Sequence, residues 1–547
     1  MSLIEKINKV VLDAFKKCGF DISGDIVTVS DRPDLADYQC NAIFKLSKEH
    51  KKNPKEIAEA VIAELGKNKM FVKVDLAGVG FLNFTLGNDF ILQNISNPIP
   101  KSGRNIVIDY GGPNVAKPLH VGHLRSAIVG ESIKRLMKFS GDKIIGDTHL
   151  GDFGLQIGQV IYGIQQQGLG IEDLTVDILD EIYPKMSALC KEDAKVIEEC
   201  ARITKDLQDG NVEYTKLWQR IMELSKTDMK DQYDYLDVHF DLWEGEADAY
   251  PYFPELEKKL KPILKESDGA QIIKINEDSP PLIYRKANGA YLYASTDLAT
   301  IYKRVKLFNP DEIVYVVDKR QKLHFDQVFT AARLAGIVPK TELTFCGFGT
   351  VNGKDGKPFK TRSGNAPKLR ELLMQIKETL KEIPQNANST DADLDVLVSA
   401  TIKFADLQNG WERDYIFDIE RFAQSVGKTG PYLLYTYARL NSLIESDSKV
   451  LPSQLYNEYD KSLALHLSRF PEIFAVAYER KSPSLIAEYL YILCEKANAF
   501  YTHNHVKGNE NAGQRNNWLA LIRLTTELIK SLSDILGISQ PTRMGRS

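Results

Sequence analysis

The chain has 547 residues, of which 43% are hydrophobic and 26% charged, with a formal net charge of −4. This composition is that of an ordinary globular protein, and the length predicts several domains. No apolar run reaches the roughly 20 residues of a membrane span, and no charged-then-apolar leader opens the chain, so we expect a cytoplasmic protein without membrane segments. The net charge does not indicate nucleic-acid binding, although local basic patches can still hold an RNA.

The positions of the cysteines argue against a structural zinc site and against disulfide bonds. They are widely scattered and form no C-x-x-C pair, which disfavours a zinc ribbon and a disulfide framework. We therefore expect reduced thiols and no zinc. The six positions are Cys18, Cys40, Cys190, Cys200, Cys346 and Cys494.

The first hundred residues predict a small α+β domain. Apolar residues recur at helical spacing in residues 2–19, and residues 31–46 and 54–65 are two further candidate helices. Residues 71–86 predict paired strands around a turn. A linker rich in proline follows over residues 94–104.

A β-loop-α-β unit follows the linker. Residues 105–110 form a short apolar, β-branched run that predicts a buried strand, and Gly111–Pro113 force a turn. The pattern over residues 119–139 is helical, and residues 143–149 predict a second strand. Such a unit places its loop and its helix start at the carboxyl edge of a parallel sheet, where ligands bind.

Two histidines, His120 and His123, lie at this helix start and enclose Gly122. The free N–H groups and the positive end of the helix dipole form a phosphate site, and imidazoles there can donate to phosphate oxygens. Gly122 lets a ligand approach without meeting a Cβ. The alternative is a pair of surface histidines that merely cap a helix.

The segments PNVAKPLHVGHLRSAIVGESI and GDTHLGDFGLQIG resemble the HIGH segment of class I aminoacyl-tRNA synthetases, and specifically that of the arginyl-tRNA synthetases. The pair Pro113–Asn114, Lys117 and the downstream run His149–Asp152 are the features of the arginine branch. The resemblance implies charging of tRNA with L-arginine at the expense of ATP, with Mg²⁺ accompanying the ATP.

A second half of the nucleotide fold begins near Ala290, with a short strand, a loop and a helix starting about Asp297. Residues 312–318 predict a strand, 319–321 a loop and 323–334 a helix. Asp297 stands where a helix N-cap belongs, and capping alone is one interpretation. The resemblance implies a second role, because the matching aspartate of the family binds the substrate guanidinium.

The resemblance also implies the remaining substrate contacts. The residues expected to bind arginine are Asp109, Gly112, Pro113, Asn114, His123, Tyr293, Asp297 and Gln321. Those expected to bind ATP or to act in catalysis are Lys117, His120, Gly122, His123, Lys360 and Arg362.

Lys360 and Arg362 belong to a glycine-rich basic loop, about residues 350–368, whose placement matches the class I KMSKS loop. The second lysine of that pattern is absent, and Lys117 is a plausible substitute cation. The sequence leaves open which of the three side chains reaches the pyrophosphate.

From residue 421 onward the pattern is helical, most clearly over 431–444, 462–478, 484–503 and 517–536. The resemblance implies an anticodon-binding bundle, in which unpaired bases could stack on aromatic side chains. The residues expected to contact tRNA are Asn41, Phe44, Tyr432, Tyr435 and Arg439. A role in the core is the alternative for Phe44 and for the tyrosines.

We therefore predict a multidomain α/β protein. Residues 1–98 form the N-terminal tRNA-contacting domain, residues 101–420 a Rossmann-like catalytic domain with a helical insertion at about 160–265, and residues 421–547 a helical bundle. The expected protein is a monomer. The alternatives are a smaller nucleotidyl transferase, an inactive tRNA-binding relative and a synthetase for another amino acid.

Overall fold

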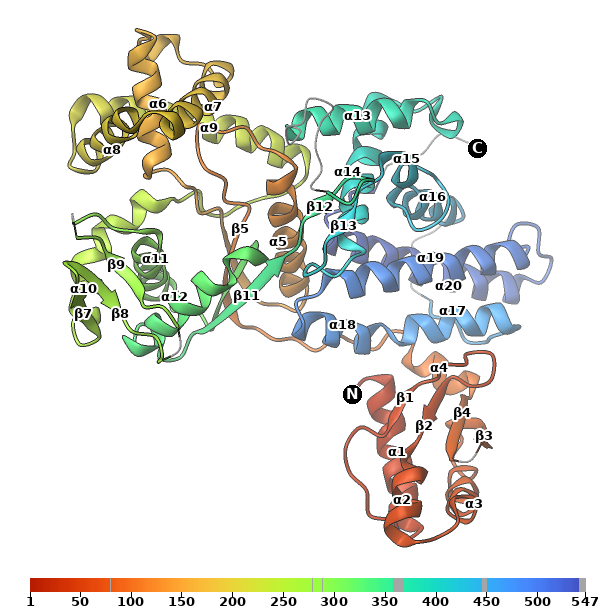
Figure 1. The fold of residues 1–547 in the computed structure, drawn as a ribbon. Coiled ribbons are helices and arrows are strands. Elements are labelled where there is room, and N and C mark those ends of the chain that lie inside the picture. Colours follow the sequence, from red (N-terminus) through yellow and green to blue (C-terminus); the bar gives the residue numbers. More distant parts are fainter. Residues whose placement is uncertain (79, 278, 288, 358–367, 445–449, 541–547) are drawn as a thin grey trace. The chain divides into compact units, whose positions relative to one another are not determined.

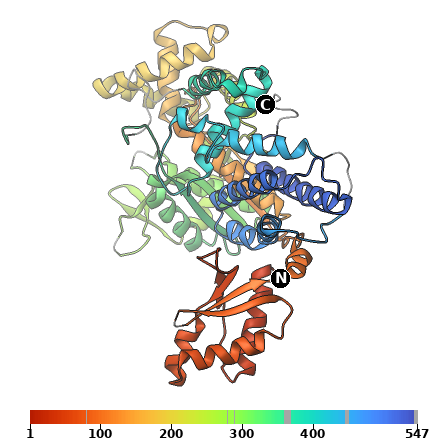
Figure 2. The same ribbon diagram turned by 90° about the vertical axis from the view of Figure 1, so that its right-hand side faces the viewer.

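The computed structural model describes the chain except residues 79, 278, 288, 358–367, 445–449 and 541–547. The described residues divide into two compact units. Figure 1 labels their helices and strands, and Figure 2 shows the same ribbon from another side. The first unit combines residues 1–100 with 433–480 and 485–532. The second comprises residues 101–432, joined by 481–484 and 533–547. No helix in the described part of the chain is long and apolar enough to span a bilayer.

The N-terminal part of the first unit is an antiparallel sheet packed with helices. The strands follow the order β1-β2-β4-β3. The elements are α1 (Leu3–Lys17), β1 (Val27–Val29), β2 (Tyr38–Cys40), α2 (Ala42–His50), α3 (Pro54–Leu65), β3 (Phe71–Ala77), β4 (Phe81–Leu86) and α4 (Asn88–Asn94).

The helix predicted over residues 31–46 is wrong in its first half. Tyr38 and Cys40 are buried and alternate with Gln39, which is the period of a strand, and the three residues pair with β4. Helix α2 begins only at Ala42. The tertiary pairing with β4 therefore decides the conformation of this segment, whose local pattern is ambiguous.

The C-terminal part of the first unit is helical. The helices are α16 (Gly430–Asn441), whose first residues belong to the second unit, α17 (Glu458–Ser468), α18 (Phe470–Glu479), α19 (Pro483–His503) and α20 (Ala512–Ile535). The single helix predicted over 462–478 is two helices, α17 and α18. Pro471 lies in the first turn of α18, where its missing N–H is tolerated. The helical conformation is interrupted just before this turn, between α17 and α18.

Polar contacts join the two parts of the first unit. Arg469 donates to the carbonyl oxygen of Asp37 at 2.6 Å and to the Tyr38 hydroxyl at 3.1 Å. Glu472 accepts from the same hydroxyl at 3.2 Å and from the backbone N–H of Ile4 at 3.1 Å. These contacts connect α18 to the N-terminal sheet and to α1.

A parallel sheet forms the centre of the second unit. Its strands are β5 (Asn105–Tyr110), β6 (Lys143–Asp147), β10 (Glu312–Asp318) and β11 (Glu342–Phe348), in the order β11-β10-β5-β6. The chain moves from β5 to β6 on one side and from β10 to β11 on the other. The strand order therefore reverses between β5 and β10, and ligands of such folds bind at the carboxyl ends of the strands at this point.

Helices connect these strands. Helix α5 (Val121–Phe139) links β5 to β6, α11 (Tyr293–Phe308) precedes β10, and α12 (Lys322–Leu334) links β10 to β11. A helix that follows a parallel strand, or leads into one through a short loop, runs antiparallel to it. The N-terminal ends of α5, α11 and α12 are therefore directed to the same edge of the sheet.

The region between β6 and α11 contains the predicted helices. They are α6 (Leu155–Gln166), α7 (Val176–Glu192), α8 (Ala194–Gln208), α9 (Val212–Tyr235) and α10 (Phe253–Leu260), with 3₁₀ turns at Ile171–Asp173 and Glu246–Tyr252. A small antiparallel sheet of β7 (Leu264–Ser267), β8 (Ala270–Ile273) and β9 (Leu282–Arg285) follows. The second unit also holds β12 (Val351–Asn352), α13 (Leu369–Lys381), a 3₁₀ turn at Pro384–Asn386, α14 (Asp391–Leu407), β13 (Tyr415–Ile416) and α15 (Ile419–Phe422).

A buried guanidinium ties α11 to the parallel sheet. Arg304 is 1% exposed and donates to Asp109 on β5 at 2.7 Å and to Asp147 on β6 at 2.6 Å. It also donates to the Tyr315 hydroxyl on β10 at 3.2 Å. One side chain thus fixes the helix against three neighbouring strands.

Replacing Arg304 by alanine is expected to lower the free energy of unfolding of the second unit by about 3–5 kcal/mol, because two buried carboxylates lose their counter-charge. The matched control is Lys306→Ala on the same helix, whose partner Glu255 lies 2.7 Å away on the surface. That control should keep the wild-type midpoint in denaturant unfolding. Equal midpoints for the two variants would contradict the importance of the buried cluster.

Candidate functional site

The turn after β5 requires glycine at two successive positions. Gly111 has a φ of +68°, which L side chains rarely adopt. A Cβ on Gly112 would lie 2.1 Å from the carbonyl oxygen of His149. The two segments thus approach each other backbone to backbone at the carboxyl ends of β5 and β6.

Backbone hydrogen bonds also join the segment after β5 to the segment after β6. The backbone N–H of Val115 donates to the Gly151 carbonyl at 3.1 Å, and that of Gly151 donates to the Pro113 carbonyl at 3.2 Å. Gly151 cannot carry a side chain, because its Cβ would lie 2.0 Å from Oδ1 of Asn114. The two motifs quoted for the family resemblance are therefore joined in space.

The two histidines of the H-x-G-H segment have a defined hydrogen-bonding state. His120 is the N-cap of α5, and its Nδ1 accepts from the backbone N–H of Gly122 at 2.9 Å. Nδ1 of His123 accepts from the backbone N–H of His120 at 3.2 Å, and the two rings stack at 3.8 Å. Because an accepting nitrogen carries no proton, each neutral ring carries its proton on Nε2.

Electrostatics keeps both rings neutral. Burial, together with the nearby charge of Lys117, lowers the pKa of His120 to about 4. Burial also lowers the pKa of His123 well below its usual value, with His120 and Lys117 acting in the same direction. Burial lowers the pKa of Lys117 as well. At neutral pH the segment therefore offers two uncharged N–H donors beside an amine.

Helix α11 begins four residues earlier than predicted. Its N-cap is Leu292, so Asp297 lies within the helix and does not cap it. The backbone N–H of Leu292 pairs with the Ser295 side chain at 3.2 Å, and this contact starts the helix at Tyr293. Tyr293 and Asp297 are four residues apart and share a face; Tyr293 is 63% exposed and the Asp297 side chain 20%.

Sequence reasoning missed two residues that act on Asp297. Nε2 of His324, on α12, lies 2.5 Å from Oδ2 of Asp297. Glu246 lies close enough to Asp297 and Tyr293 to interact electrostatically with both. The only signals in the sequence are a histidine after the loop at 319–321 and the E-G-E run at 244–246.

The carboxylates near Asp297 hold protons more strongly than usual. Burial raises the pKa of Glu246 to about 7; His149 opposes this shift, and the charges of Asp152 and Asp297 reinforce it. Burial likewise raises the pKa of Asp152 to about 6. Such crowding of acidic groups favours a bound cation, because a positive charge relieves both the repulsion and the desolvation.

The other predicted arginine-binding residues differ in accessibility. Gln321 is exposed at the start of α12, and its side chain makes no capping bond. Asp109 is buried and pairs with Arg304, and its burial raises its pKa. Both ring nitrogens of His149 are buried without a hydrogen-bond partner among the described residues.

The basic loop is described only at its two ends. At the first end, β12 pairs in parallel with β13. At the second, the backbone N–H of Leu369 donates to the Leu119 carbonyl at 2.8 Å, and Lys368 forms a β-bridge with His120. The predicted Lys360 and Arg362 lie outside the described residues.

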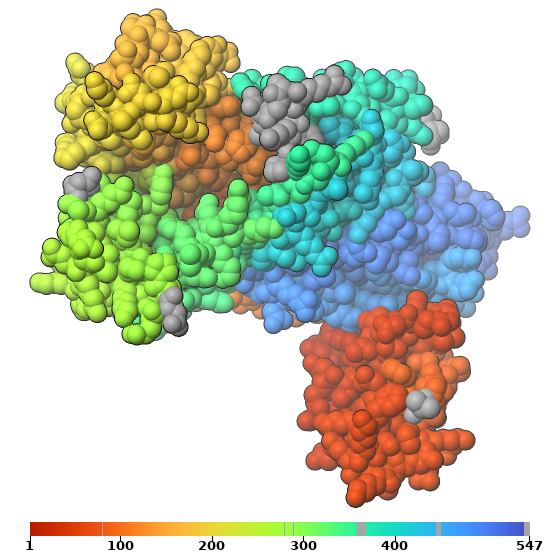
Figure 3. Space-filling model, viewed as in Figure 1, coloured from red at the N-terminus to blue at the C-terminus, as the bar shows by residue number. Residues whose placement is uncertain are grey.

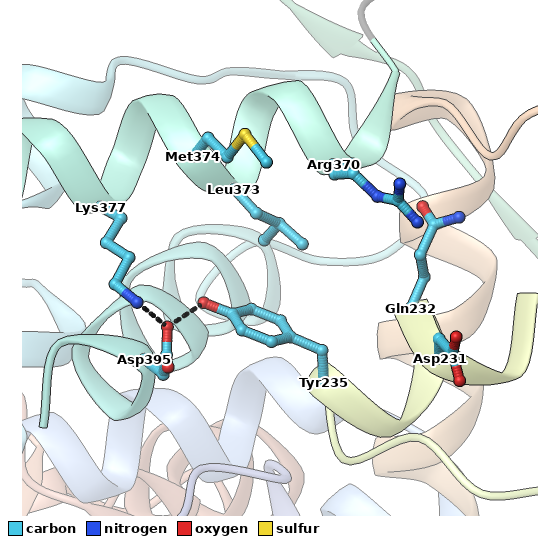
Figure 4. Close-up of a pocket in the computed structure, with 8 residues that line it drawn as sticks. All are labelled: Asp231, Gln232, Tyr235, Arg370, Leu373, Met374, Lys377 and Asp395. Atoms are coloured by element: carbon cyan, nitrogen blue, oxygen red, sulfur yellow. Dashed lines mark hydrogen bonds and ion pairs between the residues drawn. The ribbon is translucent and has the colours of Figure 1, made fainter. Parts of the chain in front are cut away.

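The second unit is hollowed beside these segments. In Figure 3 the hollow lies between the yellow insertion helices and the green segment, and the orange-brown residues around β5 and α5 line its floor. A separate apolar pocket of about 310 Å³ lies among α9, α13 and α14 (Figure 4). None of the predicted substrate-binding residues lines it, so it belongs to a different part of the unit.

The predicted tRNA-contacting residues are accessible to different degrees. Asn41 is exposed at the N-cap of α2 and makes no capping bond with its side chain. Phe44 is half-buried against Phe81, with ring centroids 5.3 Å apart. On α16, Tyr432 and Tyr435 are half-buried, whereas the exposed Arg439 donates to Asn498 at 2.7 Å.

Three family models match successive parts of the chain. Residues 2–86 match the "Arginyl tRNA synthetase N terminal domain", residues 89–419 the "tRNA synthetases class I (R), catalytic domain", and residues 433–544 the "DALR anticodon binding domain". The second match covers more than half of the chain. Together with the parallel sheet and the H-x-G-H segment, it defines the catalytic domain of a class I aminoacyl-tRNA synthetase.

Individual relatives specify the amino acid. The chain is 39% identical to the arginine–tRNA ligase of Alkaliphilus oremlandii, over 99% of this chain and 100% of that protein. The arginyl-tRNA synthetase structure from Plasmodium falciparum superposes with a TM-score of 0.82 at 26% identity, over 99% of both chains. That from Thermus thermophilus, at 21% identity and a TM-score of 0.80 over 99% of this chain and 100% of that one, supports the fold alone.

The chain belongs to the arginyl-tRNA synthetases. It is therefore a ligase that forms aminoacyl-tRNA, with ATP as a substrate, and the family predicted from the H-x-G-H segment is confirmed.

The lowered pKa of His120 predicts a specific loss of stability in acid. An unfolded histidine titrates near pH 6.5, whereas His120 in the folded chain has a pKa of about 4. Between these values the unfolded chain binds a proton that the folded chain does not, so stability falls as the pH decreases through this window. Above about pH 6.5 the effect disappears.

His120→Gln should therefore lose less stability than the wild type between about pH 7 and 5 in denaturant unfolding. The matched control is His239→Gln, at a side chain that is 57% exposed. This control should show the wild-type pH dependence. An unchanged acid dependence in His120→Gln would contradict the lowered pKa.

Proposed function

We propose that this chain activates L-arginine with ATP and transfers the arginyl group to the 2′-hydroxyl of the terminal adenosine of its tRNA, using the residues predicted above. One observation carries this assignment. The H-x-G-H segment and the far end of the basic loop meet through the Leu369–Leu119 hydrogen bond. This meeting lies where the strand order reverses, so both phosphate-binding elements serve one site.

ATP is bound at the start of α5. The Nε2–H groups of His120 and His123 donate to phosphate oxygens as negative charge develops on them, and the exposed Gly122 leaves room for the ligand. Lys117 adds a cation beside the imidazoles, and at least one of Lys117, Lys360 and Arg362 binds the pyrophosphate.

The first step joins the arginine carboxylate to the α-phosphorus. A carboxylate oxygen attacks in line, the new O–P bond forms, and the bond to the leaving pyrophosphate oxygen breaks. In the second step the terminal 2′-hydroxyl attacks the carbonyl carbon of the adenylate, loses its proton and displaces AMP. No covalent bond to the enzyme is required.

Mg²⁺ accompanies the ATP. No group of three His, Cys, Asp or Glu side chains in the described part of the chain is arranged to hold a metal ion. Phosphate oxygens and water would therefore be its main ligands, which is the usual coordination of Mg²⁺ with nucleotides. Bound there, the ion would neutralise phosphate charge.

The arginine side chain is bound at the start of α11. A carboxylate takes a guanidinium through two parallel hydrogen bonds, which a lysine substrate cannot match. Asp297 supplies this carboxylate, Tyr293 lies one turn before it, and Glu246 adds a second acidic group. The α-amino and carboxylate end of the substrate is held by the remaining predicted residues, which are Asp109, Gly112, Pro113, Asn114, His123 and Gln321.

The tRNA is bound by the terminal regions. We assign residues 1–98, through Asn41 and Phe44, and residues 421–547, through Tyr432, Tyr435 and Arg439, to RNA contacts that flank the catalytic domain at 101–420. Exposure of Asn41 and Arg439 supports this assignment. We further propose a monomer that acts in the cytoplasm, where the six free thiols stay reduced.

Pyrophosphate exchange with each amino acid, with and without total tRNA, tests the whole assignment. Exchange that depends on arginine is expected. Exchange with another amino acid in place of arginine would overturn it.

Asp297→Asn is expected to raise the KM for arginine by about a hundredfold or more, because charge-assisted hydrogen bonds to the guanidinium are lost. The KM for ATP should stay near the wild-type value. The matched control is Asp326→Asn, at a surface carboxylate paired with Lys322 at 2.8 Å. An unchanged arginine KM in Asp297→Asn would contradict the assigned pocket.

His123→Ala is expected to slow adenylate formation by about 10²–10³-fold, because it removes a donor to the developing phosphate charge. Single-turnover kinetics with saturating arginine and ATP measures this rate. His505→Ala, at an exposed side chain, serves as the control. A wild-type rate in His123→Ala would exclude the phosphate role.

A further inference from the structure

The carboxylate assigned to the guanidinium already has a partner in the protein. Nε2 of His324 lies 2.5 Å from Oδ2 of Asp297, so the imidazole and the carboxylate are directly hydrogen-bonded. The imidazole is 33% exposed and the carboxylate 20%. Because His324 is on α12 and Asp297 on α11, the contact crosses between two helices at the carboxyl edge of the sheet.

The groups around this pair are mainly acidic or apolar. Glu246, in the 3₁₀ turn before α10, and the Tyr315 hydroxyl on β10 both interact electrostatically with Asp297. On its own helix, His324 meets the ring of Phe325 edge to face at 5.2 Å, and the neighbouring Lys322 is paired with Asp326. Burial lowers the pKa of His324, but the hydrogen bond and the charge of Asp297 outweigh burial and raise it overall.

Neutral and protonated His324 have opposite consequences for an arginine ligand. A neutral imidazole donates one N–H, fixes the rotamer of Asp297 and leaves the full negative charge to the substrate. A protonated imidazole neutralises that charge and places a positive group beside the incoming guanidinium. Both cations then require the same carboxylate, whose side chain is only 20% exposed.

We propose that His324 is the positioning residue for Asp297 and that a proton on its imidazole competes with arginine for this carboxylate. The inference rests on the proposed function, because it requires Asp297 to be the guanidinium ligand. It adds a second determinant of arginine affinity, which lies on α12.

Competition of this kind has a quantitative signature. Only the fraction of enzyme with neutral His324 binds arginine tightly, so the apparent Kd rises about tenfold for each pH unit below the imidazole pKa. Binding of arginine near neutral pH also expels the proton into the buffer. The guanidinium itself stays protonated throughout this range.

Calorimetric titration of the full chain with L-arginine between about pH 6 and 8, in buffers of different ionisation enthalpy, measures both signatures. His324→Gln keeps an N–H donor for Asp297 but cannot be protonated. It is expected to bind arginine with at most a few-fold change at the upper pH and to lose the tenfold slope and the released proton. His324→Ala should bind weakly at every pH, because the carboxylate is no longer oriented.

His239→Gln is the matched control, since His239 also pairs with an aspartate, Asp237, at 2.8 Å but at the surface. It should keep the wild-type slope and proton release. Glu246 is the second group that could titrate in this range, because its pKa is about 7. Glu246→Gln therefore separates its share of the slope from that of His324.

The outcomes distinguish the inference from the function on which it rests. If wild type and Asp297→Asn bind arginine equally well, the pocket assignment fails. If Asp297→Asn loses binding while a folded His324→Gln or His324→Asn keeps the full wild-type slope and proton release, the pocket stands and the role of His324 is refuted. Folding of each variant is verified by its thermal unfolding midpoint.

Discussion

The arrangement of the catalytic unit depends on the positive charge of Arg304, which is buried against the parallel sheet. Asp109 and Asp147 end neighbouring strands, and two ionised carboxylates buried together would repel each other strongly. The guanidinium donates a hydrogen bond to each carboxylate. These bonds require α11 to lie across the two strands. Asp297 lies in the second turn of the same helix. The contacts of Arg304, two turns further along, therefore also hold the Asp297 carboxylate in position.

The two halves of the sheet edge are prepared for ligands of opposite charge. Beside β5, the start of α5 presents two neutral imidazoles and Lys117, and the backbone N–H groups of Gly122 and His123 donate within the segment. Near the start of α11, Asp297 and Asp152 each interact electrostatically with Glu246, and burial raises the pKa of Glu246 and of Asp152. Under the proposed function, the first region would receive the phosphates of ATP and the second the guanidinium of arginine.

Local patterns predicted several elements of the fold correctly. Strand 105–110, strand 312–318 and helix 54–65 have the predicted bounds, because each has a clear apolar period and a turn or cap at its ends. The errors occur where long-range contacts decide. Residues 38–40 become a strand through pairing with β4, and the start of α11 is set by a Leu292–Ser295 contact.

The site was predicted less completely, for a physical reason. His120, His123 and Asp297 belong to motifs, whereas Glu246 and His324 become relevant only when distant segments are folded together. The sequence around Glu246 or His324 gives no indication that either residue lies close to Asp297. Resemblance to a family identifies contacts made with the substrate more readily than the contacts that hold those groups in place.

His120 caps α5 with the same ring that is proposed to contact the nucleotide. Its Nδ1 accepts the hydrogen bond from Gly122 that caps the first turn of α5, and its Nε2–H can donate to a ligand. A substitution at this position is therefore expected to weaken the start of α5 and to remove the Nε2–H donor at the same time.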